Sequence, residues 1–549
     1  MKKTLLFIPA LMLSGAIYAQ SDSKNAVVNV ENDYTPEVIE VTKKNLTPSD
    51  ETKSDTNPME LLFSKEGKRF NGFTSQKDIN DILPRKEEPL PGYARVGYGF
   101  TNDINAKIAG CGISNGATMK FFAGLDGHKS DVNGLDDEWN SRIFRLQTGV
   151  GYVRKLETMM LDINGSFRNS AFNYQSIGNG VTDFTDRQNG QDYNIAVCLT
   201  PNRSDALSYN LKGGIEYVAR QYSSGRKEMI GEGRFSLGSA VGYEVLSSKM
   251  VNHIGADLNL DIFTHNRTLK NKGKGYGNYC SFDIDPYANL KLGNWKMKAG
   301  LKINLITSGS GALAVAPDIV AENNIKYNTT VYGSLTGGRR VNSFARMNEI
   351  SPYWGFTENC DSRLKPSYRI VDLKLGSRIS FEPLSMDVSA GYAYTKDDLL
   401  EVIEYTMYTL AYANFGQDNT HHLFLDMRLG CDLNGKMKLS GDIRYDFWNC
   451  NNKELLIMKP QFTIDLNGEG KVTEEITVRV GYNFTRYTKS GINGRIGNRN
   501  DLYARVSYRI NNRLGAYIEG NNLFNSKYYE YAGYVTRGIR ASLGATVNF

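Results

Sequence analysis

Apolar and polar residues alternate along most of the chain from residue 91 onward. The segment 539–549 shows this pattern without a break. Its apolar face carries Ile539, Ala541, Leu543, Ala545, Val547 and Phe549. Segments 476–484 and 502–510 repeat the pattern. Because successive side chains of a strand point to opposite faces, a period of two predicts β-strands with one apolar and one polar face.

The length of these segments separates two all-β architectures. Soluble sandwiches turn their apolar faces inward and have strands of about five to six residues. A tilted transmembrane strand needs about 9–11 residues and turns its apolar face outward. Segments 144–154, 208–222, 234–244 and 256–265 all reach that longer range. The pattern therefore predicts an all-β fold, a transmembrane antiparallel β-barrel with its apolar faces toward lipid.

Aromatic residues and connections refine this prediction. Tyrosine and phenylalanine cluster at segment ends, where interfacial girdles are expected; the clusters are Tyr93, Tyr98 and Phe100, and Tyr528, Tyr529 and Tyr531. Short connections are predicted at 114–116, 156–158, 247–249, 293–294, 382–384 and 511–512, and long polar ones at 127–140, 173–190, 266–278, 342–365, 396–420 and 487–499. Short turns face the periplasm and long loops face outward. This alternation predicts 22 strands, provided that 406–415 forms a hairpin extending an outer loop.

Composition excludes two classes of protein. The chain has 549 residues, with 54 Gly, 33 Tyr and a mean hydropathy of −0.42. A polytopic helical membrane protein would need repeated apolar runs of about 20 residues. The formal net charge is +6, with 65 basic against 59 acidic residues. That balance is too even to indicate a nucleic-acid partner.

The N-terminal region predicts export. Lys2 and Lys3 precede an apolar stretch at 5–13, and small residues lead to a cleavage site before Gln20. These are the features of a secretory signal peptide over residues 1–19. A barrel in an exported chain is expected to reside in the outer membrane of a Gram-negative cell.

Residues 20–90 differ in composition from the barrel predicted over 91–549. They are polar and form an N-terminal extension, partly disordered or held in the lumen. Val27, Val28 and Val30 form a short strand-like patch in it. Such a strand either binds a partner by adding to the edge of its sheet or packs within the lumen of the barrel itself.

Four segments resemble one family. Residues 520–529 (GNNLFNSKYY) are similar to the penultimate-strand signature of TonB-dependent receptors. Residues 28–36 (VNVENDYTP), 91–99 (PGYARVGYG) and 316–322 (APDIVAE) resemble barrel-only relatives of the Bacteroidota type. The resemblance implies a 22-stranded outer-membrane barrel, transport, and a periplasmic TonB-like partner. The family carries an N-terminal plug of roughly 130–150 residues, which 71 residues (20–90) are too few to form, so plug-gated, energy-coupled uptake is not implied for this chain.

The polar face of the strands suggests a basic lumen. The basic residues expected to point inward are Arg145, Arg479, Arg505, Arg509, Arg540 and Lys374. They either form a path for anionic solutes or pair with carboxylates across the lumen, and the second interpretation is favoured. His421 and His422 are adjacent, so their side chains point to opposite faces of a strand and cannot share a metal. No catalytic, cofactor or metal site is predicted, and no cofactor is expected.

The C-terminal strand predicts partners. Leu543, Val547 and Phe549 form the kind of terminal strand that the barrel-assembly machinery recognises, and this strand must pair with the first one to remove open edges. Outer-membrane lipids are further expected partners, and a surface lipoprotein is the alternative to the periplasmic TonB-like protein. The sequence thus indicates a non-enzymatic barrel for solute transport or binding across the outer membrane. The alternative is a barrel that does not transport and acts as a scaffold or assembly partner in an envelope complex.

Overall fold

The computed structural model describes residues 92–549 except for gaps in the connections. The gaps are 115, 134–137, 177–186, 203–205, 222–228, 247, 249, 269–275, 308–312, 326–327, 356–363, 406–409, 434 and 489–496. The predicted signal peptide, the extension over 20–90 and its Val27, Val28 and Val30 lie outside the described residues. Among the residues described, no helix has the length and apolar character to cross a membrane.

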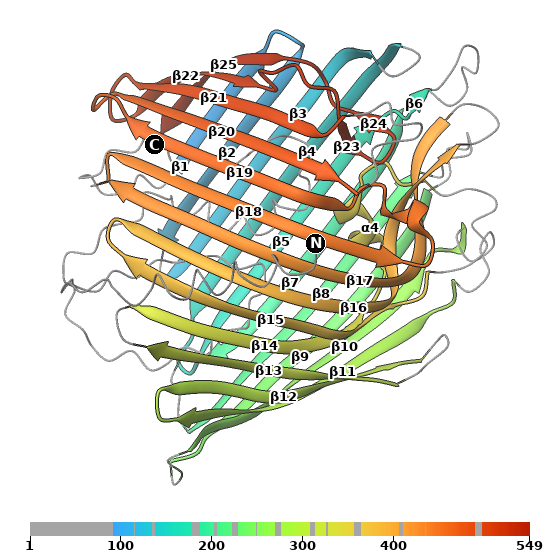
Figure 1. Cartoon of the computed structure of the whole chain (residues 1–549), viewed down its shortest axis with the longest axis vertical. Coiled ribbons are helices and arrows are strands. Elements are labelled where there is room, and N and C mark those ends of the chain that lie inside the picture. The colour runs from blue at the N-terminus through green and yellow to red at the C-terminus, as the bar shows by residue number, and fades with distance from the viewer. Residues whose placement is uncertain are drawn as a thin grey trace, which may run out of the picture.

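The described chain forms a closed antiparallel barrel (Figure 1). Its strands are β1 (Gly92–Gly99), β2 (Asp103–Ser114), β3 (Ala117–Asn133), β4 (Glu138–Lys155), β5 (Met159–Phe172), β7 (Gln188–Pro201), β8 (Leu207–Gln221), β9 (Met229–Glu244), β10 (Val251–His265), β11 (Tyr279–Leu292), β12 (Trp295–Ile306), β13 (Leu313–Ile325), β14 (Thr329–Arg340), β15 (Ser367–Phe381), β16 (Leu384–Tyr405), β17 (Leu410–Leu433), β18 (Met437–Cys450), β19 (Pro460–Lys471), β20 (Ile476–Tyr487), β21 (Arg499–Arg509), β22 (Leu514–Asn521) and β25 (Arg540–Asn548). These 22 strands form the wall and confirm the predicted fold and strand count. The two-residue β6 (Gln175–Ser176) adds to the edge of β17 outside this circuit.

The barrel closes between its first and last strands, as the sequence predicted. β1 pairs with β25 from Tyr93↔Asn548 to Gly99↔Ser542. The backbone N–H of Phe549 donates to the Gly92 carbonyl at 2.8 Å, and the reverse bond measures 2.7 Å. Every wall strand therefore has two neighbours, and no wall edge is left for lipid to meet.

Connection lengths differ between the two ends of the barrel. At the end of the barrel where the C-terminus lies, the connections are short, such as those between β11 and β12 and between β15 and β16. Those at the opposite end include long loops, and Figure 1 shows α4 (Phe344–Ile350), β23 (Tyr529–Tyr531) and β24 (Tyr534–Val535) there. By the usual orientation of bacterial barrels, the first end is periplasmic and the second is the outer end.

Two predicted loops are mostly strand. β3 and β4 stay paired as far as Asn133↔Glu138, and β16 and β17 as far as Tyr405↔Ala411. The loop boundaries at 127–140 and 396–420 were therefore wrong. Beyond the membrane a hairpin has no lipid-facing side, so the ladder continues without the apolar alternation that marks a membrane-spanning strand. The described part of 406–415 lies in this hairpin, as the strand count required.

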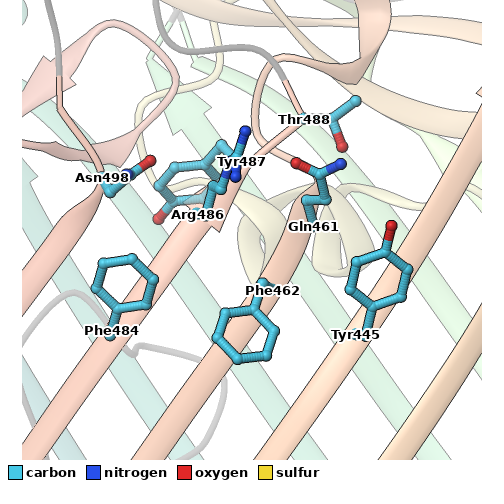
Figure 2. A pocket seen from close by; sticks show the side chains of 8 residues that line it. All are labelled: Tyr445, Gln461, Phe462, Phe484, Arg486, Tyr487, Thr488 and Asn498. Carbon is cyan, nitrogen blue, oxygen red and sulfur yellow. The ribbon is translucent and has the colours of Figure 1, made fainter.

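The two faces of the wall differ as predicted. On β17, Leu423, Leu425 and Leu429 are 41–53% exposed, whereas Asp426 between them is 3% exposed. The exposed set faces lipid and the other faces the lumen. Near the outer ends of neighbouring strands the outward face carries rings of Tyr445, Phe462 and Phe484 (Figure 2), consistent with an interfacial girdle.

A tyrosine lies across the closing seam inside the barrel. Tyr517 of β22 faces Gly544 of β25, which in turn faces Gly97 of β1. A Cβ atom at either glycine would come within 2.3 Å of the Tyr517 side chain. The ring therefore occupies the space that glycine leaves open on both strands. Arg95 donates to the Tyr517 hydroxyl at 3.0 Å, and the Arg505 guanidinium lies 4.1 Å from the ring centroid.

Candidate functional site at the outer mouth

Two outer loops fold back into the mouth of the barrel. The first connects β14 to β15 and is described over 341–355 and 364–366, including α4. The second spans 522–539 between β22 and β25 and includes the hairpin of β23 and β24. We call residues 341–355 and 522–539 the cap.

Aromatic side chains join the two loops. The rings of Tyr353 and Tyr534 stack with centroids 3.7 Å apart and planes 10° from parallel. Tyr353 also meets Phe172 of β5 edge-on at 5.3 Å. The buried cluster comprises Ile143, Phe172, Tyr174, Tyr353, Tyr528, Tyr529, Tyr534 and Val535. The interpretation of Tyr528 and Tyr529 as part of a lipid-facing girdle was therefore wrong, because both are at most 5% exposed and pack inside the cap.

Arg220 anchors the first loop to the wall. It is 4% exposed near the outer end of β8, and its guanidinium lies 4.5 Å from the Trp354 ring centroid. It donates to Asn348 Oδ1 at 3.2 Å and to the Pro352 carbonyl. The Trp354 indole N–H donates to the same Asn348 oxygen at 2.6 Å. One wall cation thus holds the helix, the turn after it and the fully buried Trp354 ring.

Glu232 of β9 holds the start of α4. Its Oε1 accepts a hydrogen bond from the Phe344 N–H at 2.8 Å, and its Oε2 lies 3.3 Å from His265 Nε2. Ser343 caps the helix by accepting from the Arg346 N–H at 3.3 Å. The Glu232 carboxylate and the helix N-cap residue Ser343 therefore accept hydrogen bonds from backbone N–H groups that have no partner within a short helix.

Asn522 closes the base of the second loop. It is fully buried, and its φ of 48° lies in the left-handed region that asparagine tolerates. Its side-chain amide donates to the carbonyls of Ser526 (3.0 Å) and Arg537 (2.9 Å) and accepts from the Ser526 N–H (2.9 Å). The two ends of the loop are thereby tied to one side chain. Asn522 belongs to the family-like segment 520–529, so that segment forms the base of the cap.

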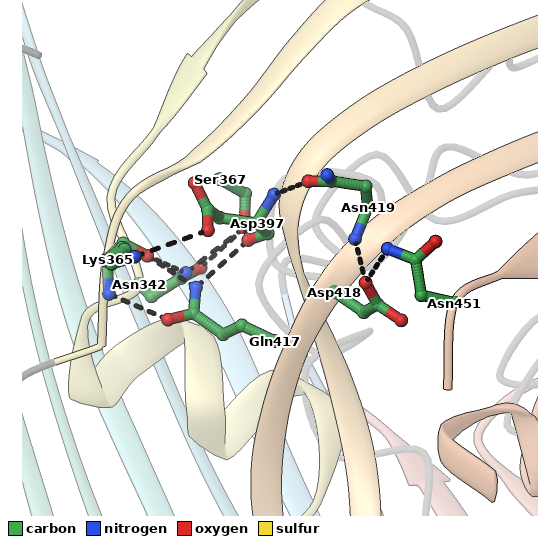
Figure 3. Close-up of polar contacts among 8 residues, drawn as sticks. All are labelled: Asn342, Lys365, Ser367, Asp397, Gln417, Asp418, Asn419 and Asn451. Carbon is green, nitrogen blue, oxygen red and sulfur yellow. Dashed lines mark hydrogen bonds and ion pairs between the residues drawn. The ribbon is translucent and has the colours of Figure 1, made fainter. Parts of the chain in front are cut away.

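A polar network ties the first loop to the extended hairpin of β16 and β17 (Figure 3). Gln417 accepts from the Lys365 N–H at 2.8 Å and donates to the Lys365 carbonyl at 2.7 Å. Asn342, at the other end of the loop, donates to the same carbonyl at 2.6 Å. The Ser367 hydroxyl donates to the Asp397 carbonyl at 2.9 Å. Both ends of the loop therefore meet at one point on the rim.

The extended hairpin also packs against the cap. Leu399, Leu400 and Phe415 are at most 8% exposed. Glu401 next to them accepts from the Ala532 N–H at 3.3 Å. This part of the β16–β17 hairpin runs beyond the pairing of β16 with β15 and the pairing of β17 with β18, and so lies outside the membrane-spanning wall. Burial raises the pKa of Glu401 to about 7, against the opposing influence of the Ala532 N–H, Ser351 and Lys459.

A second carboxylate with a raised pKa, that of Glu530, lies in the second cap loop. Glu530 lies on β23, and burial raises its pKa, while Arg540, Arg537, Arg499 and Arg145 oppose the shift. Two residues predicted to line a basic lumen, Arg145 and Arg540, thus approach the same acidic group of the cap. Arg537 itself pairs with Asp103.

The other predicted basic residues are distributed along the wall. Arg479 pairs with Glu469 at 2.5 Å, and Arg505 lies 3.9 Å from Glu519. Arg509 donates to the Glu474 carbonyl at the periplasmic turn, and Lys374 lies 5.7 Å from the Tyr332 ring centroid. These residues do not converge on one site.

The C-terminal residues and the paired histidines lie as strand geometry requires. Leu543, Val547 and Phe549 are 38–51% exposed on the outward face. His422 points inward, with its ring 3.6 Å from that of Trp448 and its Nε2 2.6 Å from Asp446 Oδ1. His421 points outward and bonds the Tyr392 hydroxyl. Within the described residues, no group of three potential ligands is placed to hold a metal ion.

The cap residues were not found from the sequence. Arg220 lies in an ordinary alternating strand, and Trp354 lies in a polar loop without a regular period. The one available signal was the segment 520–529, whose Asn522 and Tyr528 belong to the cap. No signal in the sequence indicated Tyr517 of the seam. Its two glycine partners, Gly97 and Gly544, lie on other strands and are distant from it in the sequence.

The barrel defines the class of protein, an outer-membrane-type β-barrel of 22 strands, and solved structures share its fold. The FrpB iron transporter from Neisseria meningitidis is 10% identical, with a TM-score of 0.64 over 86% of this chain and 83% of that one. The siderophore receptor PirA from Pseudomonas aeruginosa is 11% identical, with a TM-score of 0.60 over 85% of this chain and 81% of that one. The copper transporter OprC is 10% identical, with a TM-score of 0.62 over the same shares of the two chains. The chain therefore has the fold of TonB-dependent receptors. No protein-family model and no curated protein matches the sequence.

Proposed function

We propose that this protein is an outer-membrane barrel that binds or admits a solute at its outer mouth, where the cap acts as the gate. The observation that carries the proposal is the stacking of Tyr353 on Tyr534, which joins two loops far apart in the chain inside a wide barrel. A 22-stranded barrel encloses a lumen that must be filled or left as a channel. The structural neighbours include transporters and receptors, which supports a transport role.

The cap has the composition of a binding surface. It presents tyrosine rings and the carboxylate of Glu530, which several arginines approach, and Glu401 of β16 lies against it. Much of the basic charge on the wall is already matched by carboxylates, so the wall does not favour anions strongly. We therefore assign solute recognition to the cap rather than to Arg479, Arg505 or Arg509.

Location and partners complete the proposal. Residues 1–19 direct export, and the terminal strand with Leu543, Val547 and Phe549 engages the barrel-assembly machinery. Outer-membrane lipids surround the wall. Val27, Val28 and Val30 of the extension dock onto a periplasmic TonB-like protein or pack in the lumen. The role is non-enzymatic and needs no cofactor.

The test is solute flux through purified protein in liposomes. Replacing residues 529–535 by a Gly-Ser segment of equal length removes the Tyr534 contact and leaves the wall strands unchanged. We expect little flux of small sugars through the wild type and rapid flux through the variant. Equal flux through both would show that the cap is not the gate. Retention of compact migration in unheated detergent controls for folding of the variant.

A second function, scaffolding of an envelope complex with a surface lipoprotein, is favoured by the same closely packed cap, because a mouth that never opens cannot transport. The two functions differ in what purifies with the intact protein. Stoichiometric co-purification of a lipoprotein, with no solute able to raise flux through the wild type, would establish the scaffold. Solute-dependent flux through the barrel alone would establish the transporter.

A further inference from the structure

A pocket of about 700 Å³ opens on the outward face of the wall (Figure 2). It lies at the outer ends of β18, β19 and β20. Tyr445, Phe462 and Phe484 form its lower part, and Arg486, Gln461 and Asn498 lie above them in Figure 2. The pocket is therefore apolar toward the middle of the membrane and polar toward its outer surface.

Strand register explains this arrangement. Tyr445 pairs with Phe462, and Phe462 pairs with Arg486, so all three side chains lie on one face of the sheet. That face is the lipid-facing one, since Tyr445 and Phe447 on β18 are 47% and 53% exposed. The register shifts between Pro460 and Phe462, which leaves Gln461 as an extra residue in β19. Such a bulge re-aims a side chain locally, here into the pocket.

Among the described residues, no carboxylate neutralises the positive charge in the pocket. Arg486 is exposed, and among the described residues no carboxylate forms an ion pair with it. By contrast, Arg234, Arg369 and Arg479 on the strands all pair with carboxylates. A guanidinium at the membrane interface above three aromatic rings attracts an anionic head group. The rings of Phe462 and Phe484, with centroids 6.4 Å apart, form a surface for hydrocarbon.

We propose that this pocket binds an anionic, phosphate-bearing lipid of the outer leaflet. The phosphate lies against Arg486 with Gln461, Thr488 and Asn498 as hydrogen-bonding groups, and an acyl chain runs down over Phe462, Phe484 and Tyr445. A soluble anion would use only the upper half of the pocket, whereas a lipid matches both halves. The site is independent of the solute that passes the cap.

The test uses purified, delipidated protein in a neutral detergent, titrated with phosphatidylglycerol and followed by native mass spectrometry. Arg486→Gln removes the charge and Arg486→Lys retains it. Arg142→Gln is the matched control, because Arg142 is an exposed arginine near the outer end of β4 that already donates to Asn140 Oδ1 at 2.7 Å. Phe484→Ala tests the apolar half. Compact migration in unheated detergent confirms that each variant is folded.

We expect Arg486→Gln to weaken retention of the first phosphatidylglycerol molecule by roughly fivefold, as the loss of one interfacial charge implies. Arg486→Lys should retain most of the binding, and Arg142→Gln should leave it unchanged. Phosphatidylcholine should bind no better to the wild type than to Arg486→Gln. Equal retention of phosphatidylglycerol by wild type and Arg486→Gln would overturn the proposal. So would full displacement of the lipid by millimolar inorganic phosphate with binding unaffected by Phe484→Ala, which would indicate a site for a free anion.

Discussion

The guanidinium of Arg220 on the barrel wall lies 4.5 Å from the centroid of the Trp354 indole in the first cap loop. The same guanidinium lies 4.9 Å from the Phe172 ring centroid, so it is placed between a loop ring and a wall ring. It is also hydrogen-bonded to Asn348 and to the Pro352 carbonyl. A single buried cation thus connects the packing of the loop to the packing of the wall.

Arg220→Ala should open the cap. The change removes a cation–π contact and hydrogen bonds to a charged group, which together cost about 2–4 kcal/mol of cap stability. We expect a clear rise in single-channel conductance in planar bilayers. Arg142→Ala, on the outward face of β4, is the control and should not change conductance. A low conductance for Arg220→Ala in a correctly folded barrel would mean that the remaining contacts hold the cap without it.

The closing seam gives a second prediction. Gly97→Val places branched carbons where the Tyr517 ring lies, with a Cβ only 2.3 Å from its hydroxyl oxygen. Displacing the ring also breaks the hydrogen bond from Arg95. Overpacking of this kind costs about 1–3 kcal/mol. The temperature at which the barrel loses compact migration in detergent should fall.

Gly112→Val is the matched control for the seam, because nothing lies within 4 Å of a Cβ added at Gly112 in β2. It should leave the transition temperature nearly unchanged. If both variants behaved alike, the Tyr517 ring would not be what limits side-chain size at Gly97.

The fold was predictable from the sequence and the cap was not, for a physical reason. Alternation reports the two faces of each strand separately, whatever its neighbours are, so the wall and its closure followed from the pattern in segments such as 539–549. The rings of Tyr528 and Tyr529 give the same sequence pattern whether they contact lipid or pack against other aromatic rings. A single sequence does not distinguish these two surroundings, and only the fold-back of the loop shows which one applies.

The pH dependence of the cap follows from Glu401. Its pKa is raised by burial to about 7 from an ordinary value of 4.5. A carboxyl with a raised pKa in the packed state contributes stability that is complete below its ordinary pKa and is lost as the pH rises through about 7. The direction is the same for Glu530, whose pKa is also raised. The cap should therefore be more tightly closed at pH 5 than at pH 8.

The measurement is open probability in planar bilayers between pH 5 and pH 8. Wild type should open more often as the pH rises, and Glu401→Gln should remain closed with a flatter profile. Glu322→Gln, at the opposite end of the barrel, should keep the wild-type profile. An open probability that falls with rising pH would contradict the sign derived from Glu401.

Removal of residues 543–549 should abolish membrane insertion. The segment supplies most of the pairing of β25 with β1 and with β22, for example Leu543↔Tyr98 and Val547↔Leu514. Without it two strand edges face lipid, where unpaired backbone groups cost several kcal/mol each. Fractionation should find the truncated protein degraded or in the periplasm. Normal outer-membrane levels would contradict the role of this strand in closure and assembly.

The extension over 20–90 gives the last prediction, which separates a stopper from a docking arm. The cap occupies the outer mouth through wall contacts such as that of Arg220 with Trp354, so closure does not require the extension. Removing residues 21–90 while keeping the signal peptide should therefore leave conductance low. Combining the deletion with Arg220→Ala should give the conductance of Arg220→Ala alone. A large conductance for the deletion by itself would instead make the extension the stopper, with Val27, Val28 and Val30 as its anchoring strand. Low conductance together with loss of binding to a periplasmic partner would identify the extension as the docking arm.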